Sequence, residues 1–382
     1  MIGVKDSALL NWAQSNYAEV VAETFPISTI GGGCTGIFRS RLDFYSNENP
    51  FDEFAELERI LNNIQPDVVL SDAHPLMALV CEKLKISHVS LASASWTKYY
   101  THNRPPSNWD WMGQLLGTPF KQVIRRLATL YFNKKLVGWA DPLNQVAAVY
   151  GLKKRSTVLE YVEGNDMTLI TDIPEFGPLK NPLENVKYCG PIYWHPPFNS
   201  HDLIKLLNNE KKAIYVSLGS NRDFSLLANI ASWLLASDYQ VVMTLPKVSL
   251  LPHDLVENSD LITAELINVL DILPLCEAAI FHGGIGTLYQ VLACGKPSVI
   301  LPFHIEHFWN GNRLEQMGLG YVLHRRLISK DRFISVLTKA INNRQMRRSI
   351  EKISSKITNT SGAKRAAELI RDEITDPRPH GL

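Results

Sequence analysis

The sequence predicts an α/β protein of two Rossmann-like domains that face each other across a cleft. Short apolar runs alternate with longer amphipathic stretches over most of the chain, and this alternation is typical of parallel strands joined by helices. A proline-rich stretch at 190–197 (GPIYWHPP) divides the alternation into two series, because proline interrupts both helices and strands. Ligands of doubly wound sheets bind at the carboxyl ends of the strands, so we expect a site in the cleft.

The expected strands are short, rich in Val, Ile and Leu, and end at Asp, Ser, Gly or Pro. Such runs are typical of parallel strands that are buried on both faces. They lie at 67–71, 88–92, 167–171, 213–218, 240–244, 278–281 and 298–301. Helices are expected between them, among others at 51–64, 120–136, 226–236 and 287–294.

The composition excludes several classes of protein. A chain of 382 residues suits two domains of ordinary size. With 45% hydrophobic and 20% charged residues it is not disordered, and a net charge of +1 does not favour nucleic acid as a partner. The five cysteines are scattered and form no C-x-x-C pair, so neither a disulfide framework nor a zinc site is expected. The same scatter of cysteines suits a reducing setting, so we expect a cytoplasmic protein. No apolar run is long enough to span a membrane.

One motif suggests a binding site for a diphosphate. The expected strand at 278–281 ends in 282–287 (HGGIGT), and a helical pattern follows at once. Glycine permits a sharp turn and a close approach of the backbone to a ligand, and a helix N-terminus offers N–H groups and a positive dipole end. His282 and Thr287 would add further donors. Taken alone, the glycines are also compatible with a tight turn that binds nothing.

The residues that follow extend this motif. Gly295 and Pro297 precede a second apolar strand, and Pro302, Glu306, Asn310, Arg313 and 318–320 (GLG) come after it. The whole stretch at 281–320 resembles the donor-binding signature of the UDP-glycosyltransferase family, which includes plant, antibiotic-modifying and macrolide-type enzymes. The resemblance implies the GT-B fold.

The resemblance also implies roles for residues of the donor site. His282, Gly284, Gly286 and Thr287 would hold the diphosphate, and Glu306 would hydrogen-bond the sugar hydroxyls together with its neighbour. The full predicted set is Ser220, His282, Gly284, Gly286, Thr287, Gln290, Glu306, His307 and Asn310.

The sequence departs from the family pattern at three places. Gln290 stands where a glutamate would clasp the ribose, and His307 stands where a glutamine usually follows the acid. The stretch at 267–269 (INV) replaces the usual base-stacking segment. The departure at His307 puts the usual sugar preference in doubt.

The resemblance covers nearly the whole chain and implies its domain plan. Residues 188–191 (YCGP) resemble the interdomain Gly-Pro, and 361–367 resemble the final helix. We therefore expect an acceptor-binding domain at 1–190, a linker at 191–206 and a nucleotide-sugar-binding domain at 207–352. The last segment, 353–382, would pack back on the first domain.

The implied activity is an inverting, metal-independent transfer of a hexose from a UDP-sugar, or another NDP-sugar, to a hydroxyl of a small acceptor. The aromatic-rich stretch at 96–111 suggests an apolar acceptor. No cofactor is expected. The family's base is a histidine oriented by an aspartate that matches Asp72, but the sequence does not plainly contain that histidine. The alternative is a non-catalytic or truncated relative that binds a nucleotide sugar or an apolar ligand without turnover.

The beginning of the chain is the weakest part of the resemblance. Residues 1–3 are similar to the tail of the family's second strand, so we expect that one N-terminal βαβ unit is absent. The base would belong to that unit, and His74, close to Asp72, is only a poor substitute. The competing hypothesis is a genuinely shortened protein that lost or relocated catalysis.

Other motifs would indicate other classes of protein. The stretch at 31–36 (GGGCTG) matches G-x-G-x-x-G, but no helical pattern follows it, so we interpret it as a loop. An esterase would need G-x-S-x-G, and a metal-dependent GT-A transferase Asp-x-Asp; neither occurs. His304 and His307 flank one acid, and we expect no metal there.

The helix expected at 120–136 mixes basic and apolar residues. It suits either a membrane surface or a helix packed on one side and solvated on the other, and the second interpretation is the commoner. The expected partners are therefore a small-molecule acceptor and a nucleotide sugar, with peripheral membrane contact left open.

Overall fold

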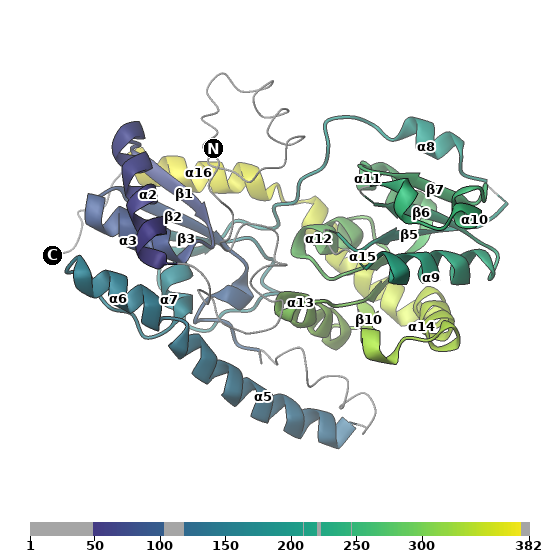
Figure 1. Ribbon diagram of the computed structural model, residues 1–382, viewed down its shortest axis with the longest axis horizontal. Coiled ribbons are helices and arrows are strands. Elements are labelled where there is room, and N and C mark those ends of the chain that lie inside the picture. Colours follow the sequence, from purple (N-terminus) through teal and green to yellow (C-terminus); the bar gives the residue numbers. More distant parts are fainter. Residues whose placement is uncertain (1–48, 103–117, 209, 220–222, 246, 376–382) are drawn as a thin grey trace. The chain divides into compact units, whose positions relative to one another are not determined.

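The computed structural model describes residues 49–102, 118–208, 210–219, 223–245 and 247–375. The chain divides into two compact units, Met1–Leu91 with Asn133–Thr168 and Ala92–Phe132 with Leu169–Leu382 (Figure 1). The sequence predictions for 1–48, for Ser220 and for most of 96–111 lie outside the described residues. The predicted domain boundaries at 190, 206 and 352 stay predictions.

The first unit contains a parallel strand pair with helices. Strands β1 (Val68–Asp72) and β2 (Ser87–Ala92) pair in register from Val68 opposite Ser87 to Asp72 opposite Leu91. They belong to a sheet of order β1-β2-β3-β4, with β3 at Met167–Ile170 and β4 at Val186–Tyr188. The helices are α2 (Pro50–Ile64), α3 (Pro75–Leu84), α6 (Asp141–Val149) and α7 (Val158–Val162).

Helix α2 shows how local sequence specifies an element here. Asn49 caps it by accepting the N–H of Phe51, and Pro50 occupies the first helical position, where a proline costs no hydrogen bond. The buried residues recur at the three- and four-residue spacing of one helix face. They are Phe54, Leu57, Ile60 and Leu61.

The second unit is built on a six-stranded sheet of order β10-β9-β8-β5-β6-β7. Its paired strands run parallel. The strands are β5 (Lys212–Ser217), β6 (Tyr239–Thr244), β7 (Leu261–Ala264), β8 (Cys276–Phe281), β9 (Ser298–Ile300) and β10 (Gly320–Val322). The chain adds β6 and β7 on one side of β5, then returns to add β8, β9 and β10 on the other. The reversal between β5 and β8 is the switch point at which doubly wound sheets bind ligands.

Helices flank this sheet, and α9 and α14 run along it in Figure 1. Besides the helices already given, the longer helices of the described chain are α5 (Thr118–Gly138), α9 (Phe224–Leu235), α12 (Ile285–Ala293), α13 (Ile305–Gln316), α14 (Lys330–Asn342), α15 (Arg344–Thr358) and α16 (Gly362–Thr375). Short turns are η1 (Ala94–Trp96), α8 (His201–Lys205), η2 (Val248–Leu250), α10 (His253–Val256), α11 (Val269–Ile272), η3 (Leu273–Leu275) and η4 (Arg325–Leu327). The core is one cluster in which strand residues such as Tyr215 and Phe281 are fully buried.

All the predicted strands and the four predicted helices are present, within about two residues at each end. The prediction missed β4, β7 and β10, which have three or four residues each. Among the helices of the described residues, none has the length and apolar character that crossing a membrane requires.

Candidate functional site

The glycine-rich turn lies at the switch point of the six-stranded sheet. Strand β8 ends at Phe281, and α12 begins at Ile285 with Gly284 as its N-cap. No side chain caps this helix end within the described part of the chain. The first N–H groups of a helix have no intrahelical partner, so this end offers donors and a positive dipole to an anion.

The turn is held in shape by its neighbours. Gly283 adopts φ +99°, a left-handed conformation that favours glycine. The side-chain amide of Asn310, on α13, donates to the carbonyl of Gly283 at 2.9 Å. Asn310 is only 3% exposed, so its predicted place in the donor site is that of a buried support for the turn.

The glycines of the turn differ in whether the folded chain leaves space for a Cβ atom. A Cβ at Gly284 would collide with Nε2 of His282, and one at Gly283 would come within 2.9 Å of the His307 carbonyl. A Cβ at Gly286 would meet nothing within 4 Å, and Gly286 has no left-handed φ. The folded chain therefore requires glycine at 283 and 284 but leaves open space at 286.

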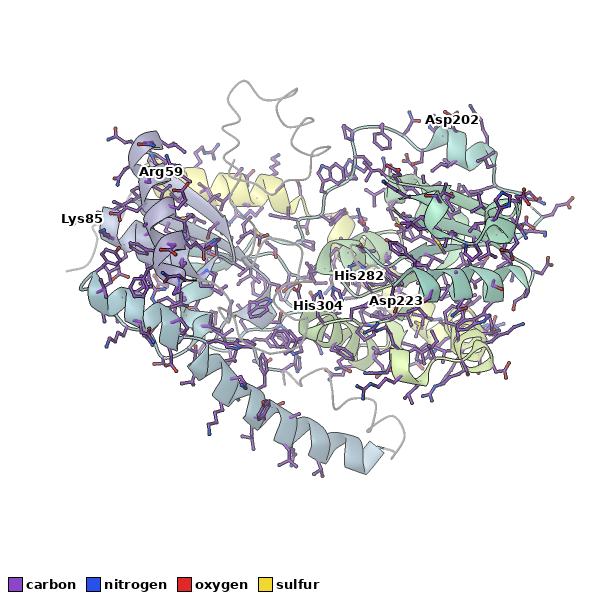
Figure 2. All side chains as sticks on the ribbon, viewed as in Figure 1. Arg59, Lys85, Asp202, Asp223, His282 and His304 are labelled. Atoms are coloured by element: carbon purple, nitrogen blue, oxygen red, sulfur yellow. The ribbon has the colours of Figure 1, made fainter. Side chains whose placement is uncertain are left out.

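Three histidine rings pack beneath this turn. The His282 and His307 centroids are 4.5 Å apart in an edge-to-face arrangement, and the His304 and His307 centroids are 3.3 Å apart. Figure 2 labels His282 and His304 near the first turns of α12 and α13. His282 also lies against Gly219 at the end of β5, where a Cβ would approach its ring to 2.7 Å. The cluster thus joins the ends of β5, β8 and β9.

The three rings are held neutral. Burial lowers the pKa of His282 to about 4, with a partial offset from the Ser217 backbone. Burial and the neighbouring His282 lower the pKa of His304 to about 3, and burial also depresses the pKa of His307. At neutral pH these residues therefore contribute hydrogen bonds and packing to the site, not positive charge.

The remaining predicted donor residues lie on α12 and α13. Thr287 and Glu306 are in the first turns of these helices and are half-buried. Gln290 is 8% exposed, and its amide donates to the Trp194 carbonyl at 2.7 Å. His307 is 4% exposed, and its Nδ1 faces the N–H of Phe303 at 3.5 Å. Of the sugar-binding pair, Glu306 is thus the more accessible.

Comparisons with known proteins identify what this chain is similar to. Residues 228–379 match the family model described as erythromycin biosynthesis protein CIII-like, C-terminal domain. A PGL/p-HBAD biosynthesis glycosyltransferase of Mycobacterium tuberculosis is 24% identical over 314 residues, which cover 81% of this chain and 71% of that protein. Among solved structures, the calicheamicin glycosyltransferase CalG4 is similar with a TM-score of 0.60 at 19% identity, covering 86% of this chain and 81% of that one.

The chain is a glycosyltransferase of the GT-B fold.

Two further relatives of this GT-B glycosyltransferase bear on its function. A PGL/p-HBAD biosynthesis rhamnosyltransferase of Mycobacterium bovis is 24% identical over 305 residues, which cover 78% of this chain and 65% of that protein. A protein of Mycobacterium bovis named inactive PGL/p-HBAD biosynthesis glycosyltransferase is 27% identical over 185 residues, 48% of this chain and 50% of that protein. The resemblance found in the motif at 281–320 is confirmed, whereas the individual site residues stay predictions.

The glycosyltransferase has a buried polar pair that the sequence analysis missed. Asp172 follows β3 and is 2% exposed; one carboxylate oxygen accepts the Tyr289 hydroxyl at 2.7 Å and the other accepts the Ala94 N–H at 2.6 Å. The Tyr289 oxygen in turn accepts the Ile173 N–H at 3.2 Å. Since Tyr289 is on α12, this network ties the helix that begins at the glycine turn to the segment after β3.

Burial governs the electrostatics of this pair. Desolvation raises the pKa of Asp172 to about 6, although hydrogen bonds from Tyr289 and Ala94 oppose it. Desolvation and the Asp172 charge raise the pKa of Tyr289 well above its usual value. An aspartate after a buried strand is common, so position 172 carried a weak signal. The sequence gives no signal that Tyr289, 117 residues away, is the partner of Asp172.

A cavity of about 390 Å³ opens beside the first turn of α13. It is lined by Asp223, Pro302, Phe303, Phe308, His324, Arg325 and Arg326. Arg325 lies 3.1 Å from the Asp223 carboxylate and 4.2 Å from the centre of the Phe303 ring. Asp223 also caps α9 by accepting the Leu226 N–H. The cavity therefore has aromatic walls and charged groups.

The predicted catalytic acid of the first unit stands apart from such networks. Asp72 is the last residue of β1 and is exposed. Desolvation by the surrounding protein raises the pKa of its carboxyl group, and the charge of His74 opposes this rise. His74 begins α3, and its Nε2 lies 3.2 Å from a carboxylate oxygen of Glu53. Neither residue has the other as a hydrogen-bond partner. In the part of the chain that the structure describes, no three His, Cys, Asp or Glu side chains could hold a metal ion.

Proposed function

We propose that this glycosyltransferase moves a sugar from a UDP-sugar, or another nucleoside diphosphate sugar, to a hydroxyl of a small apolar acceptor with inversion of configuration. The observation that carries the proposal is the uncapped N-terminus of α12 at the switch point, with open space above Gly286. A helix N-terminus with no side chain over it suits a diphosphate, and no feature of the folded chain itself requires glycine at 286.

The proposed chemistry is a direct displacement at the anomeric carbon. The acceptor oxygen forms the new bond as its proton passes to a base, and the bond from the anomeric carbon to the diphosphate oxygen breaks. The leaving diphosphate takes the electron pair, and its growing charge is stabilised by the helix dipole, the N–H groups and the Thr287 hydroxyl. Because the three histidines are neutral, this stabilisation comes from dipoles. We therefore propose that neither a metal ion nor a cofactor is needed.

Glu306 is the residue that we propose for the sugar hydroxyls. It lies in the first turn of α13 with part of its side chain accessible, and in the sequence it stands between Phe303 and Phe308, which line the cavity. His307 was predicted to share this role. Its buried ring supports a different contribution, in which it packs against His282 and fixes the turn beside the diphosphate.

A binding protein without turnover remains the second candidate. It is favoured by Asp72, which has no histidine among its described hydrogen-bond partners, and by a relative whose name includes the word inactive. Asp72 would orient the base in the catalytic hypothesis.

A transferase located in the cytoplasm, as proposed from the cysteines, would meet nucleotide sugars there.

Calorimetry and a transfer assay separate these candidates. The purified chain is titrated with UDP, dTDP and GDP, and then incubated with the matching nucleotide sugars and a panel of apolar hydroxyl compounds. The proposed transferase binds one nucleotide and forms a glycoside. Nucleotide binding without any glycoside supports the second candidate. If none of the three nucleotides binds, the transferase is contradicted, and so is a second candidate that binds a nucleotide sugar.

A further inference from the structure

Helix α5 presents apolar residues on its outward face. It runs over 21 residues, Thr118–Gly138, and is drawn as one continuous helix in Figure 1. Val123, Leu127, Leu130 and Val137 are 57%, 54%, 67% and 50% exposed, respectively. These values are unusual for large apolar side chains that share one helix.

The exposed residues form a stripe opposite a buried one. Successive residues of an α-helix turn by about 100°, so spacings of four, three and seven keep the four exposed residues within a narrow sector. Ala128, Phe132 and Leu136 lie on the other side and are at most 3% exposed. The helix therefore packs through one face and carries a second apolar face outward, beyond what a surface helix needs.

The charge of α5 is as unusual as its apolar stripe. Its sequence has no Asp or Glu and five basic residues, Lys121, Arg125, Arg126, Lys134 and Lys135. The whole chain has a net charge of only +1. Lys134 falls within the sector of the stripe and Arg126 borders it, and both are exposed. A surface of this kind is complementary to a partner that is apolar inside and anionic outside.

We infer that α5 docks on an anionic phospholipid surface, with the stripe in the acyl boundary and the exposed Arg126 and Lys134 at the headgroups. An apolar helix face flanked by Lys and Arg is the composition of helices that lie in a membrane interface. A second copy of the chain fits less well, because packing two stripes face to face would bring Arg126 and Lys134 of both copies together. The inference does not depend on the proposed transfer reaction.

Vesicle sedimentation with the full chain tests this surface. Vesicles of phosphatidylcholine alone and of phosphatidylcholine mixed with phosphatidylglycerol are compared at low and high salt. We expect binding to the anionic vesicles that falls with salt, because each basic residue near the surface contributes about fivefold in affinity. Arg126→Gln with Lys134→Gln should lower the affinity by about tenfold or more, and Leu127→Ser with Leu130→Ser should lower it at least as much.

Matched variants on other elements control for a general loss of charge or apolar surface. Arg348→Gln with Lys352→Gln changes two exposed basic residues of α15, and Val149→Ser with Leu206→Ser changes two side chains that are 67% and 58% exposed. These controls should bind vesicles like the parent. Circular dichroism should show that all variants keep the parent's fold, since the changed side chains are exposed.

Three results would overturn the inference. The first is a parent protein that does not sediment with anionic vesicles. The second is a set of α5 variants that bind like the parent. The third is a pair of α15 substitutions that lowers the affinity as much as the α5 substitutions do. Analytical ultracentrifugation identifies the rival occupant. A parent dimer that the Leu127→Ser, Leu130→Ser variant dissociates, without vesicle binding by the parent, would assign α5 to a second copy instead.

Discussion

The carboxyl ends of β8 and of β1 are both followed by a helix, but the two junctions are built differently. After β8, the turn at 282–284 is pinned by Asn310 and packed on histidine rings. After β1, Asp72 is exposed, and the next histidine, His74, lies against Glu53. The first junction is braced from several elements of the second unit. The second junction has no comparable support for its predicted catalytic residue among the described residues.

This difference bears on the two halves of the proposed reaction. Binding a diphosphate needs N–H groups at a helix end and space for the ligand, and one contiguous stretch provides both. Activating an acceptor needs a base and its orienting acid within hydrogen-bond reach. The base and its orienting acid come from separate parts of a fold. A chain can therefore have the residues proposed to bind the donor and lack the pair that would activate the acceptor.

The largest effect is expected at the proposed sugar contact. Glu306→Ala should lower kcat/KM of transfer by about a hundredfold or more, because a group that contacts the reacting sugar acts on the transition state. Binding of free UDP should remain nearly unchanged in calorimetry. Glu315→Ala, on the same helix, is the matched control and should retain activity. Equal loss of UDP binding in Glu306→Ala would show that Glu306 supports the fold of the site and does not contact the sugar.

The next effect concerns the buried Asp172, whose pKa of about 6 lies above the value of about 3.9 in an unfolded chain. The folded state therefore binds the proton of the Asp172 carboxyl group more tightly than the unfolded state does. This tighter binding stabilises the fold below the pKa of the unfolded state, and the stabilisation is lost as the pH rises through the pKa of the folded state. A difference of two units corresponds to about 3 kcal/mol.

Urea unfolding measured across this pH range tests the assignment. The parent should lose stability between about pH 4 and pH 6 relative to Asp172→Asn, in which the group no longer titrates. Tyr289→Phe should also destabilise the chain, since it removes the hydroxyl that donates to the carboxylate. Parallel pH profiles for the parent and Asp172→Asn would contradict the pKa shift.

A smaller effect is expected at the helix end. Thr287→Ala should weaken UDP binding by about 1–3 kcal/mol, the contribution of a hydrogen bond to a charged group. Thr263→Ala, on the half-buried part of β7, should leave UDP affinity unchanged. If calorimetry gave the same UDP affinity for Thr287→Ala and the parent, the diphosphate would have to lie elsewhere.

The sequence predicted those features of the molecule that are local. The apolar runs predicted β5, β6 and β8 because each forms a buried strand. The glycine turn was found because its residues are adjacent in the chain. The motif also predicted that His307 contacts the sugar, but the direction of its ring depends on His282 and His304, which pack against it in the folded chain.

Features made by distant residues could not be predicted in this way. The bond between Asp172 and Tyr289 joins positions 117 residues apart, and nothing in either local sequence indicates the other. The outward stripe of α5 was visible as a mixture of basic and apolar residues. Which of its two apolar faces is buried depends on the elements packed against it, and the structure was needed to identify the exposed one.

The smallest effect separates the two kinds of glycine in the turn. Gly286→Ala places a methyl group in open space and should raise stability by about 0.5–1 kcal/mol, because alanine is the better helix former. The same methyl group would occupy the space proposed for the nucleotide, so UDP affinity should fall. Gly284→Ala should instead lower the melting temperature, because its Cβ collides with His282. A Gly286→Ala protein that is more stable and binds UDP as well as the parent does would show that the open space above α12 is not the diphosphate site.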